Sequence, residues 1–393
     1  MPKFLEYDYV VVGAGIAGSA ASYFLSEHSD SVLLIDKNEK VAFGASGAAG
    51  AFLSPLLGKD NAFKSLITKS LKFSTQFYKS LGNELLTNCG VCRIPKNQED
   101  RDKFESYRTS MDFEYEQMDD GYFFPIGSQV NPSEICEYLT KDIKTKLNYE
   151  INYLEQLDDK SWLINNEIKA KHVILTTGAD TRLIKEKYFN IRAVWGQKID
   201  VSTTSKPIIN YHKECSISKA IPYKDDLYKV SLGATHHRFD CDKDICNYCV
   251  EVANINSCSR CYKSDMVDED SLKLISLAND IINIDNVSVL DIKIGARASS
   301  LDYFPMVGEL VDSDKSIEAY PHILNGSFIK EENLKMIENL HVINGVGGRG
   351  FVLSPYLAKS LVDNIINEKE LDSNITTYRL FKRWAKRLKN KKK

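Results

Sequence analysis

The chain has 393 residues, of which 43% are hydrophobic and 27% are charged, and its formal net charge is −3. This length exceeds what one simple core usually supports, so we expect two closely joined domains. The small negative charge argues against general nucleic-acid affinity of the whole surface. No apolar run approaches the ~20 residues that cross a bilayer. The segment Met1–Tyr9 carries Glu6 and Asp8 and lacks the pattern of a signal peptide, so we expect a cytoplasmic protein.

A glycine motif, Val10-Val-Val-Gly13-Ala-Gly15-Ile-Ala-Gly18, follows the first predicted strand, and a second apolar strand ends at Asp36. Gly13 permits a tight turn, Gly15 lets a pyrophosphate approach the backbone, and Gly18 lets the helix pack close to the strand. The helix N-terminus directs its N–H groups at the phosphates, and Asp36 is placed to accept hydrogen bonds from ribose hydroxyls. The unit predicts a dinucleotide site; the alternative is a glycine-rich turn with a structural role alone.

Small residues fill the next stretch, Phe43-Gly-Ala-Ser-Gly-Ala-Ala-Gly50. Such a segment either lets a flat ligand lie against the backbone or serves as an ordinary flexible connector. We then expect two helices, because apolar residues recur at helical spacing over 61–82 and over 133–147. Asn131 or Ser133 can cap the second helix.

Three later segments predict strands. Lys171–Asp180 is an apolar strand that ends in a Thr-Thr-Gly-Ala turn, which is typical of the middle of a parallel sheet. Residues 191–202 and 217–235 alternate apolar and polar side chains, as antiparallel strands with one exposed face do. His341–Gly350 repeats the pattern of strand and glycine turn, with a helix from about Leu353 to Ile366. The fold class that we expect is α/β, a Rossmann-type dinucleotide domain interrupted by an antiparallel-sheet domain.

The C-terminal segment is strongly basic: from Arg379 to Lys393 it holds nine lysines and arginines and no acid. Such a segment can bind phosphates through counterion release. It can equally be the solvated end of a helix. It therefore permits an RNA partner without identifying one.

Five of the nine cysteines lie between Cys241 and Cys261. Two C-x-x-C pairs are separated there by eight residues, Cys246 with Cys249 and Cys258 with Cys261. Four thiolates in this pattern suit a structural Zn²⁺, and a cytoplasmic location argues against disulfides. An iron–sulfur site and unliganded thiols are the alternatives. A third pair, Cys89 with Cys92, stands alone, so we expect no metal there.

The order of these motifs carries a family resemblance. After the first glycine motif come Gly44–Gly47, Val173–Asp180, Trp195–Gln197, Arg297 with Asp302–Gly308, and Gly345 with Arg349–Phe351. This order resembles the D-amino-acid oxidase and glycine oxidase superfamily of FAD enzymes over almost the whole chain. Within it, the chain is most similar to the FAD-dependent half of the MnmC enzymes, which process the wobble uridine of tRNA.

The resemblance implies bound FAD and a glycine oxidase-like fold in which an antiparallel sheet covers the isoalloxazine. Arg297 and Arg349 stand in the two motifs where related oxidases place substrate-binding arginines; each could instead cap a carbonyl or pair with an acid. His236, His237 and Tyr303 are further pocket candidates. The expected cofactor-binding residues are Gly13, Gly15, Ile16, Ala17, Gly18, Asp36, Lys37, Gly44, Ala45, Ser46, Gly178, Gly345, Gly347, Gly348 and Gly350.

The resemblance also implies a reaction. The flavin half of the tRNA enzymes oxidises 5-carboxymethylaminomethyl-uridine to 5-aminomethyl-uridine and releases glyoxylate. It implies tRNA as substrate and, since only nine residues precede the flavin motif, a separate methyltransferase as a possible partner. The first alternative is a glycine, sarcosine or D-amino-acid oxidase that acts on a free amine. The second is a flavoprotein or RNA-binding module without catalysis.

The expected domains are discontinuous. We expect the FAD-binding domain at 1–85, 128–195 and 289–370, and the substrate domain at 86–127 and 196–288. The Cys-rich insertion occupies 241–261, and a basic tail occupies 371–393.

Overall fold

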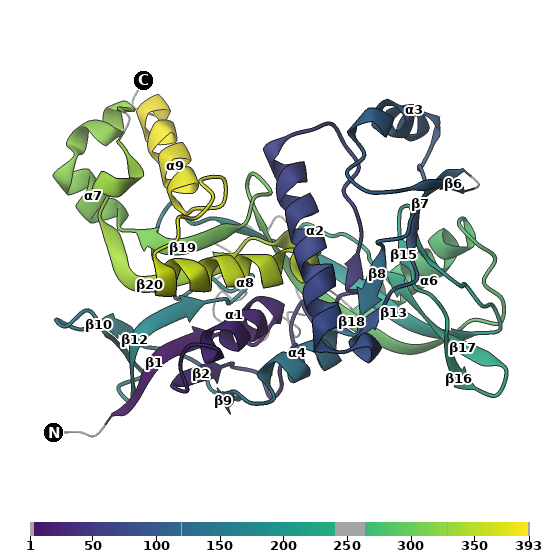
Figure 1. Ribbon diagram of the computed structural model, residues 1–393, viewed down its shortest axis with the longest axis horizontal. Coiled ribbons are helices and arrows are strands. Elements are labelled where there is room, and N and C mark those ends of the chain that lie inside the picture. The colour runs from purple at the N-terminus through teal and green to yellow at the C-terminus, as the bar shows by residue number, and fades with distance from the viewer. Residues whose placement is uncertain (1–3, 119, 240–263, 328, 392–393) are drawn as a thin grey trace.

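The computed structural model describes residues 4–118, 120–239, 264–327 and 329–391 (Figure 1). Within them, the first sheet has eight strands in the order β10-β11-β12-β1-β2-β9, with β20 paired to both β12 and β19. Its strands are β1 (Leu5–Val12), β2 (Val32–Ile35), β9 (Lys144–Lys146), β10 (Leu154–Gln156), β11 (Trp162–Ile164), β12 (Ile168–Leu175), β19 (Met306–Val311) and β20 (Met336–Asn344).

Four pairings in this sheet are parallel: β1 with β12, β1 with β2, β2 with β9, and β12 with β20. The carboxyl ends of these strands therefore meet at one edge, where α/β proteins bind their ligands. The strand predicted within Lys171–Asp180 is confirmed as β12, in the middle of this parallel arrangement.

The described part of the second sheet has nine strands in the order β18-β13-β17-β15-β14-β5-β7-β6, with β16 paired to β17. Its strands are β5 (Val91–Arg93), β6 (Glu116–Met118), β7 (Gly121–Phe124), β13 (Ile191–Thr203), β14 (Asn210–His212), β15 (Ser216–Ile217), β16 (Ile221–Lys224), β17 (Leu227–Gly233) and β18 (Ser288–Ser300). A small third sheet joins β3 (Phe52–Leu53), β8 (Ser128–Val130) and β4 (Leu86–Thr87).

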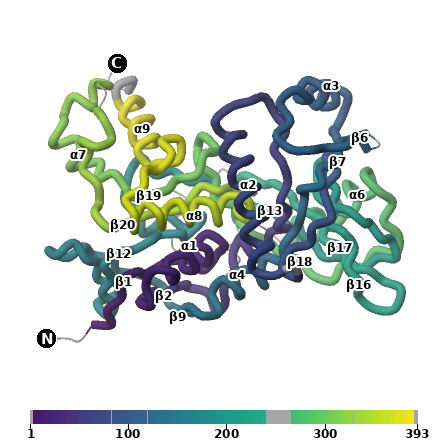
Figure 2. The backbone as a smooth tube through the Cα atoms, in the orientation of Figure 1, coloured from purple at the N-terminus to yellow at the C-terminus, as the bar shows by residue number. Residues whose placement is uncertain are grey.

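Helices cover both faces of the first sheet. The described helices are α1 (Ile16–Ser26), α2 (Ala62–Leu81), α3 (Gln98–Ser106), α4 (Pro132–Thr140), α6 (Ser264–Asn279), α7 (Ser313–Ala319), α8 (Gly350–Asn367) and α9 (Tyr378–Lys391); short 3-10 turns are η1 (Asn83–Leu85), η2 (Arg108–Ser110), η4 (Pro321–Asn325), η5 (Glu331–Asn333) and η6 (Gly347–Arg349). Side chains of α1, α2, α4 and α8 share one core with Val11 and Ile174, while α9 packs on the other face with Val10 and Val173. Figure 2 shows α1, near the N-terminus, beside α8, near the C-terminus.

The predicted helices are confirmed with one correction. The 61–82 helix is α2, and the side chain of Asn61 caps it by accepting a hydrogen bond from Lys64 N (3.0 Å). The 133–147 helix ends early: α4 stops at Thr140, and Lys144–Lys146 forms β9 beside β2. The apolar spacing continued past Thr140, but pairing with a buried strand outweighed helix propensity there.

The predicted antiparallel strands are present, but one of the two predicted segments forms several strands. Residues 191–202 lie in β13, whereas 217–235 divides among β15, β16 and β17. Asp225 takes a left-handed φ of 46° between β16 and β17, which allows the chain to turn back. The alternating pattern identified the sheet but did not show this turn.

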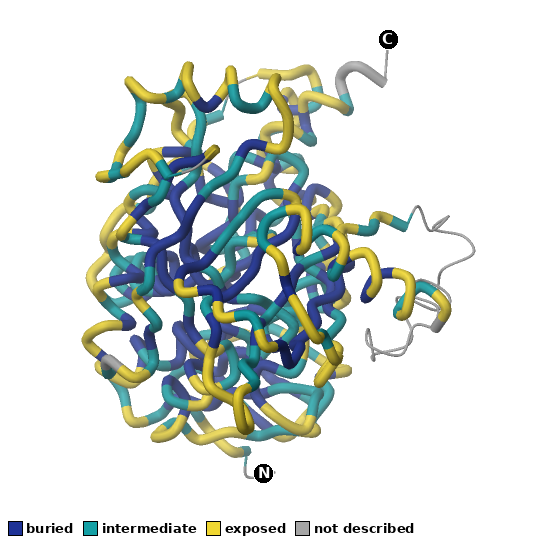
Figure 3. Tube along the Cα trace, turned by 90° about the vertical axis from the view of Figure 1, so that its right-hand side faces the viewer, coloured by how far each residue is buried: buried dark blue, intermediate teal, exposed yellow. Residues whose placement is uncertain are grey.

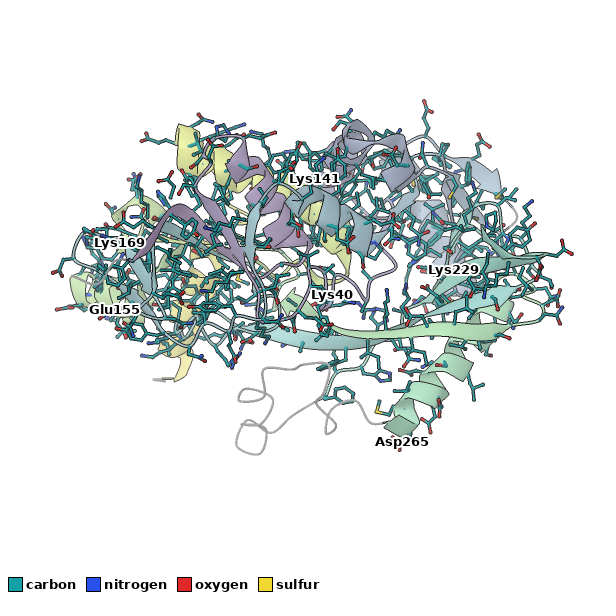
Figure 4. The ribbon with its side chains drawn as sticks, turned by 90° about the horizontal axis from the view of Figure 1, so that it is seen from below. Lys40, Lys141, Glu155, Lys169, Lys229 and Asp265 are labelled. Atoms are coloured by element: carbon teal, nitrogen blue, oxygen red, sulfur yellow. The ribbon has the colours of Figure 1, made fainter. Side chains whose placement is uncertain are left out.

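The longest ladder joins β13 and β18, whose partners run from Ile191↔Ser300 to Ser202↔Ser288. Figure 4 shows α6, with Asp265 near its start, standing below these two strands. The domain boundaries remain a proposal. Because β18 belongs to the nine-stranded sheet, we move the end of the substrate domain from residue 288 to Ser300. Figure 3 shows the buried residues gathered in the interior and the exposed residues around the outside. Among the described helices, none has the length and apolar content to span a membrane.

Candidate active site

A cavity of about 830 Å³ lies at the carboxyl edge of the parallel sheet and extends to the nine-stranded sheet. Residues after β1, β2, β12 and β20 line one end, and residues of β5, β14, β18 and η6 line the other. The cofactor residues expected from the sequence lie in this lining, with the exception of Gly18; they are Gly13, Gly15, Ile16, Ala17, Asp36, Lys37, Gly44, Ala45, Ser46, Gly178, Gly345, Gly347, Gly348 and Gly350. The structure thus brings together residues more than 300 positions apart in the sequence. Their roles toward the cofactor remain predictions.

Gly18 packs the helix against the strand and does not line the cavity. A Cβ there would lie 1.8 Å from Gly13 O and 2.6 Å from Thr176 Oγ1. At the N-terminus of α1, Ile16 N donates a hydrogen bond to Ser46 Oγ (2.9 Å). This contact joins the small-residue loop to the helix end that would face a pyrophosphate.

The acidic residue after β2 is held firmly. Asp36 accepts hydrogen bonds from Ala14 N (2.6 Å) and Asn38 N (2.8 Å). Lys37, predicted to contact the cofactor, forms an ion pair with Asp180 (2.7 Å), which also pairs with Arg182. Burial raises the pKa of Asp180, but these two cations outweigh it and bring the pKa to about 2. This end of the cavity therefore carries fixed, ionised groups suited to hydroxyl and amine hydrogen bonding.

Two glycines leave open space at the ligand's expected position. A Cβ on Gly44 or on Gly178 would meet no described atom within 4 Å, and Gly178 has a left-handed φ of 61°. The loop at Gly44 also rests on β18, where a Cβ on Gly295 would lie 2.8 Å from Ala45 Cα. A cradle of this kind, with a helix N-terminus and a ribose-binding acid, fits FAD.

The opposite end of the cavity is cationic. Arg297 on β18 donates to Thr235 O (3.1 Å), and Arg349 in η6 donates to Ser54 O (3.2 Å). Burial lowers the pKa of Arg349 to about 10, which leaves it charged at neutral pH. Both arginines line the cavity, so the structure brings the two predicted substrate residues to one place.

Sequence reasoning missed Arg93 and His212 at this end. They are neighbours across β5 and β14, where Arg93 pairs in register with His212. Burial first, then the charge on Arg93, holds the pKa of His212 well below its usual value. Nothing in the local sequence signalled this pair, because it forms only when two strands more than 100 residues apart align.

The other residues predicted near the pocket lie in different places. His236 and Tyr303 line the cavity; burial, followed by the charge on Arg297, lowers the pKa of His236 to about 4. His237 instead lies 2.7 Å from Asp270. Gln197 donates to Ser271 Oγ (2.7 Å) and Val267 O (2.9 Å), so it anchors α6 to the sheet.

The proposed zinc ligands Cys246, Cys249, Cys258 and Cys261 lie outside the described residues. Among the residues that the structure does describe, no group of three or more His, Cys, Asp or Glu side chains could hold a metal ion. The zinc site therefore stays a prediction.

Comparison with known proteins finds relatives that align with more than nine-tenths of this chain. The MnmC protein of Campylobacter hominis, named tRNA 5-methylaminomethyl-2-thiouridine biosynthesis bifunctional protein, is 23% identical over 411 residues, which cover 91% of this chain and 60% of the relative. The MnmC protein of Legionella pneumophila strain Corby is 25% identical, covering 93% of this chain and 55% of the relative. The chain thus spans 55–60% of the length of these relatives.

Solved structures show the same fold. Glycine oxidase from Geobacillus kaustophilus matches with a TM-score of 0.66 and 17% identity, covering 93% of this chain and 96% of that one. L-Proline dehydrogenase from P. horikoshii matches with a TM-score of 0.65 and 15% identity, covering 97% and 99%. The family model described as FAD dependent oxidoreductase matches residues 8–364. With this match across most of the chain and a cavity that fits the dinucleotide, the protein belongs to the family of FAD-dependent oxidoreductases.

Proposed function

We propose that this FAD-dependent oxidoreductase cleaves the carboxymethylaminomethyl group of tRNA wobble uridine, leaving aminomethyl-uridine and releasing glyoxylate. The observation that carries the proposal is the cavity, which joins a dinucleotide cradle to a guanidinium-rich end with the charge that binds a carboxylate. The names of the MnmC relatives support tRNA as the substrate. A methyltransferase is the proposed partner for the other step, as the likeness to the MnmC proteins implies.

The chemistry converts an N–CH₂–COO⁻ group to an imine, which water divides into a primary amine and glyoxylate. FAD, when bound, supplies the two-electron oxidant. Arg297 and Arg349 would bind the carboxylate, since a guanidinium presents two parallel N–H donors to it. Their positive charge also lowers the pKa of a bound amine, which favours the neutral amine that this oxidation requires. His236 adds no further positive charge near neutral pH, because its pKa lies at about 4.

Tyr303 presents an exposed side chain beside the cavity. Tyr303 lines the cavity yet is 62% exposed. An exposed aromatic ring at the mouth suits stacking on an unpaired base, as single-stranded RNA recognition commonly uses. The anticodon loop presents the wobble uridine as such a base.

Helix α9 presents a basic face. Leu380, Phe381 and Ala385 are buried against the first sheet. The exposed residues of the same helix are Lys382, Arg383, Lys386 and Arg387. A helix with one face fixed and the other cationic suits contact with a phosphate backbone. The basic segment forms helix α9 (Tyr378–Lys391), and its contact with RNA is part of the proposal.

Anaerobic reduction of the bound flavin tests the proposal. The purified holoenzyme is mixed with tRNA bearing the carboxymethylaminomethyl group, with the same tRNA lacking it, and with glycine and sarcosine. Bleaching of the flavin spectrum by the modified tRNA alone, with glyoxylate released, is the expected result. Bleaching by the free amino acids alone would make the protein a small-molecule amine oxidase. Bleaching by none of them would leave it without the proposed catalysis.

A further inference from the structure

Arg93 projects into the cavity from the nine-stranded sheet. Its Nη1 donates to Ser54 Oγ (3.1 Å) and Pro55 O (3.2 Å). Its Nε is buried and has no hydrogen-bond partner among the described residues.

Arg349 lies on the other side of the same serine. Its Nη1 donates to Ser54 O (3.2 Å), so one residue contacts both guanidinium groups. Burial, followed by the charge on Arg349, lowers the pKa of Arg93 to about 9. Two like charges thus stand close together at one end of the cavity.

No described carboxylate neutralises this pair. Among the ion pairs of the described residues, all with N···O distances of 4.0 Å or less, neither Arg93 nor Arg349 has a partner, although Glu214 also lines the cavity. Arginines that serve structure usually pair with acids or cap several carbonyls. This pair instead keeps donor capacity toward the cavity.

His212 lies beside the pair and adds no third charge. It is the register partner of Arg93 on β14, and its Nδ1 lies 2.6 Å from Ser216 Oγ. Burial and the two arginines favour its neutral form. Arg93 and Arg349 therefore place two positive charges beside a neutral imidazole, an arrangement that suits a compact anion.

We propose that Arg93 and Arg349 together form a carboxylate subsite, in which Arg93 determines specificity for N-carboxymethyl substrates. The proposal rests on the proposed function, since the carboxylate is that of the amine being oxidised. It adds a residue from the substrate sheet to the two arginines of the expected motifs. Arg297, on β18, keeps its proposed role toward the same carboxylate, and its donation to Thr235 O fixes its position.

Binding of a redox-inert carboxylate tests the subsite. Methoxyacetate has the shape of sarcosine, but an ether oxygen replaces its amine, and its binding is followed by the change in the flavin spectrum of the oxidised holoenzyme. Arg93→Met should raise the Kd for methoxyacetate about 10-fold to 100-fold, because a hydrogen-bonded charge is lost. Arg192→Met, which removes an exposed arginine outside the cavity lining, is the matched control and should leave the Kd unchanged.

A second variant, and comparison with the flavin-bleaching experiment, complete the test. Arg93→Lys retains the charge without the planar fork and should give an intermediate Kd; if Arg93→Met fails to load FAD, this variant decides. A Kd within twofold of wild type in the variant that loads FAD would overturn the subsite. If methoxyacetate binding depends on Arg93 but modified tRNA does not bleach the flavin, the subsite is retained and tRNA is rejected as the substrate. If modified tRNA bleaches the flavin but methoxyacetate binding does not depend on Arg93, only the subsite is rejected.

Discussion

Arg379 Nε lies 2.7 Å from Asp302 Oδ2, which fastens the start of α9 to the segment that carries Tyr303. The same guanidinium donates to Phe304 O (2.9 Å) and Pro305 O (3.1 Å). One side chain therefore couples the basic helix to the mouth of the cavity.

Replacing this link should loosen both elements. Arg379→Met removes a half-buried ion pair and several carbonyl contacts, so we expect a loss of about 2–4 kcal/mol in the free energy of unfolding. Urea unfolding of the holoenzyme measures it. Arg383→Met, an exposed neighbour on the same helix, should change stability by less than about 0.5 kcal/mol. Equal losses in both variants would remove Arg379 from this role.

Tyr303→Ala should lower activity on modified tRNA without changing the binding of a small carboxylate. Loss of a stacking surface costs about 1–3 kcal/mol per base, so kcat/KM for modified tRNA should fall about 10-fold or more. The Kd for methoxyacetate should not change, because the arginines that would bind it remain. Tyr153→Ala, which removes a tyrosine that is 39% exposed outside the cavity lining, is the control. Unchanged tRNA kinetics in Tyr303→Ala would rule out stacking there.

Neutralising the basic face of α9 should weaken tRNA binding in a salt-dependent way. A variant with Lys382, Arg383, Lys386 and Arg387 changed to Gln removes up to four phosphate contacts. The slope of log Kd against log salt should become shallower, as measured by fluorescence anisotropy with labelled tRNA. A slope identical to that of the wild type would place the RNA contact elsewhere.

Gly18→Ala should prevent FAD loading. Its Cβ would overlap Gly13 O at 1.8 Å, so α1 would have to move away from the turn that receives the pyrophosphate. We expect little flavin to co-purify, as read from the ratio of absorbance at 450 and 280 nm. At Gly58 the added methyl meets no atom within 4 Å, so Gly58→Ala should load normally. A fully loaded Gly18→Ala protein would contradict the close packing.

His341 should make the protein sensitive to acid. It is buried against His172, and burial, followed by the charge of His172, lowers its pKa to about 3. Because the folded pKa lies below the unfolded value near 6.5, the unfolded state binds the proton first. Stability is therefore lost as the pH falls from 6.5 toward 3, by about 3 kcal/mol at pH 4.

The measurement is the free energy of unfolding at pH 7 and pH 4. His341→Asn should lower stability at pH 7 yet lose less of it on acidification than the wild type does. His322→Asn, at an exposed position, should keep the wild-type difference. If His341→Asn also kept the wild-type difference in the free energy of unfolding between pH 7 and pH 4, the acid sensitivity would have another origin.

The features predicted well from the sequence are those fixed by neighbours along the chain. The turn at Gly13 and the acid at Asp36 belong to one βαβ unit, so spacing alone places them. The end of α4 was wrong because β9 depends on β2, a partner distant in sequence. The meeting of Arg93 with Arg349 depends on how two sheets close around Ser54, and no local pattern encodes that.

The placement of β12 between β1 and β20 has a consequence for synthesis. β1 and β12 leave the ribosome early, but β20 (Met336–Asn344) follows more than 150 residues after β12. Until it arrives, one side of β12 lacks its parallel neighbour, and such long-range pairing forms slowly. A nascent chain that lacks β20 therefore exposes a strand edge of the kind that associates with other chains, and the cavity that fits FAD is complete only once the residues after β20 have been made.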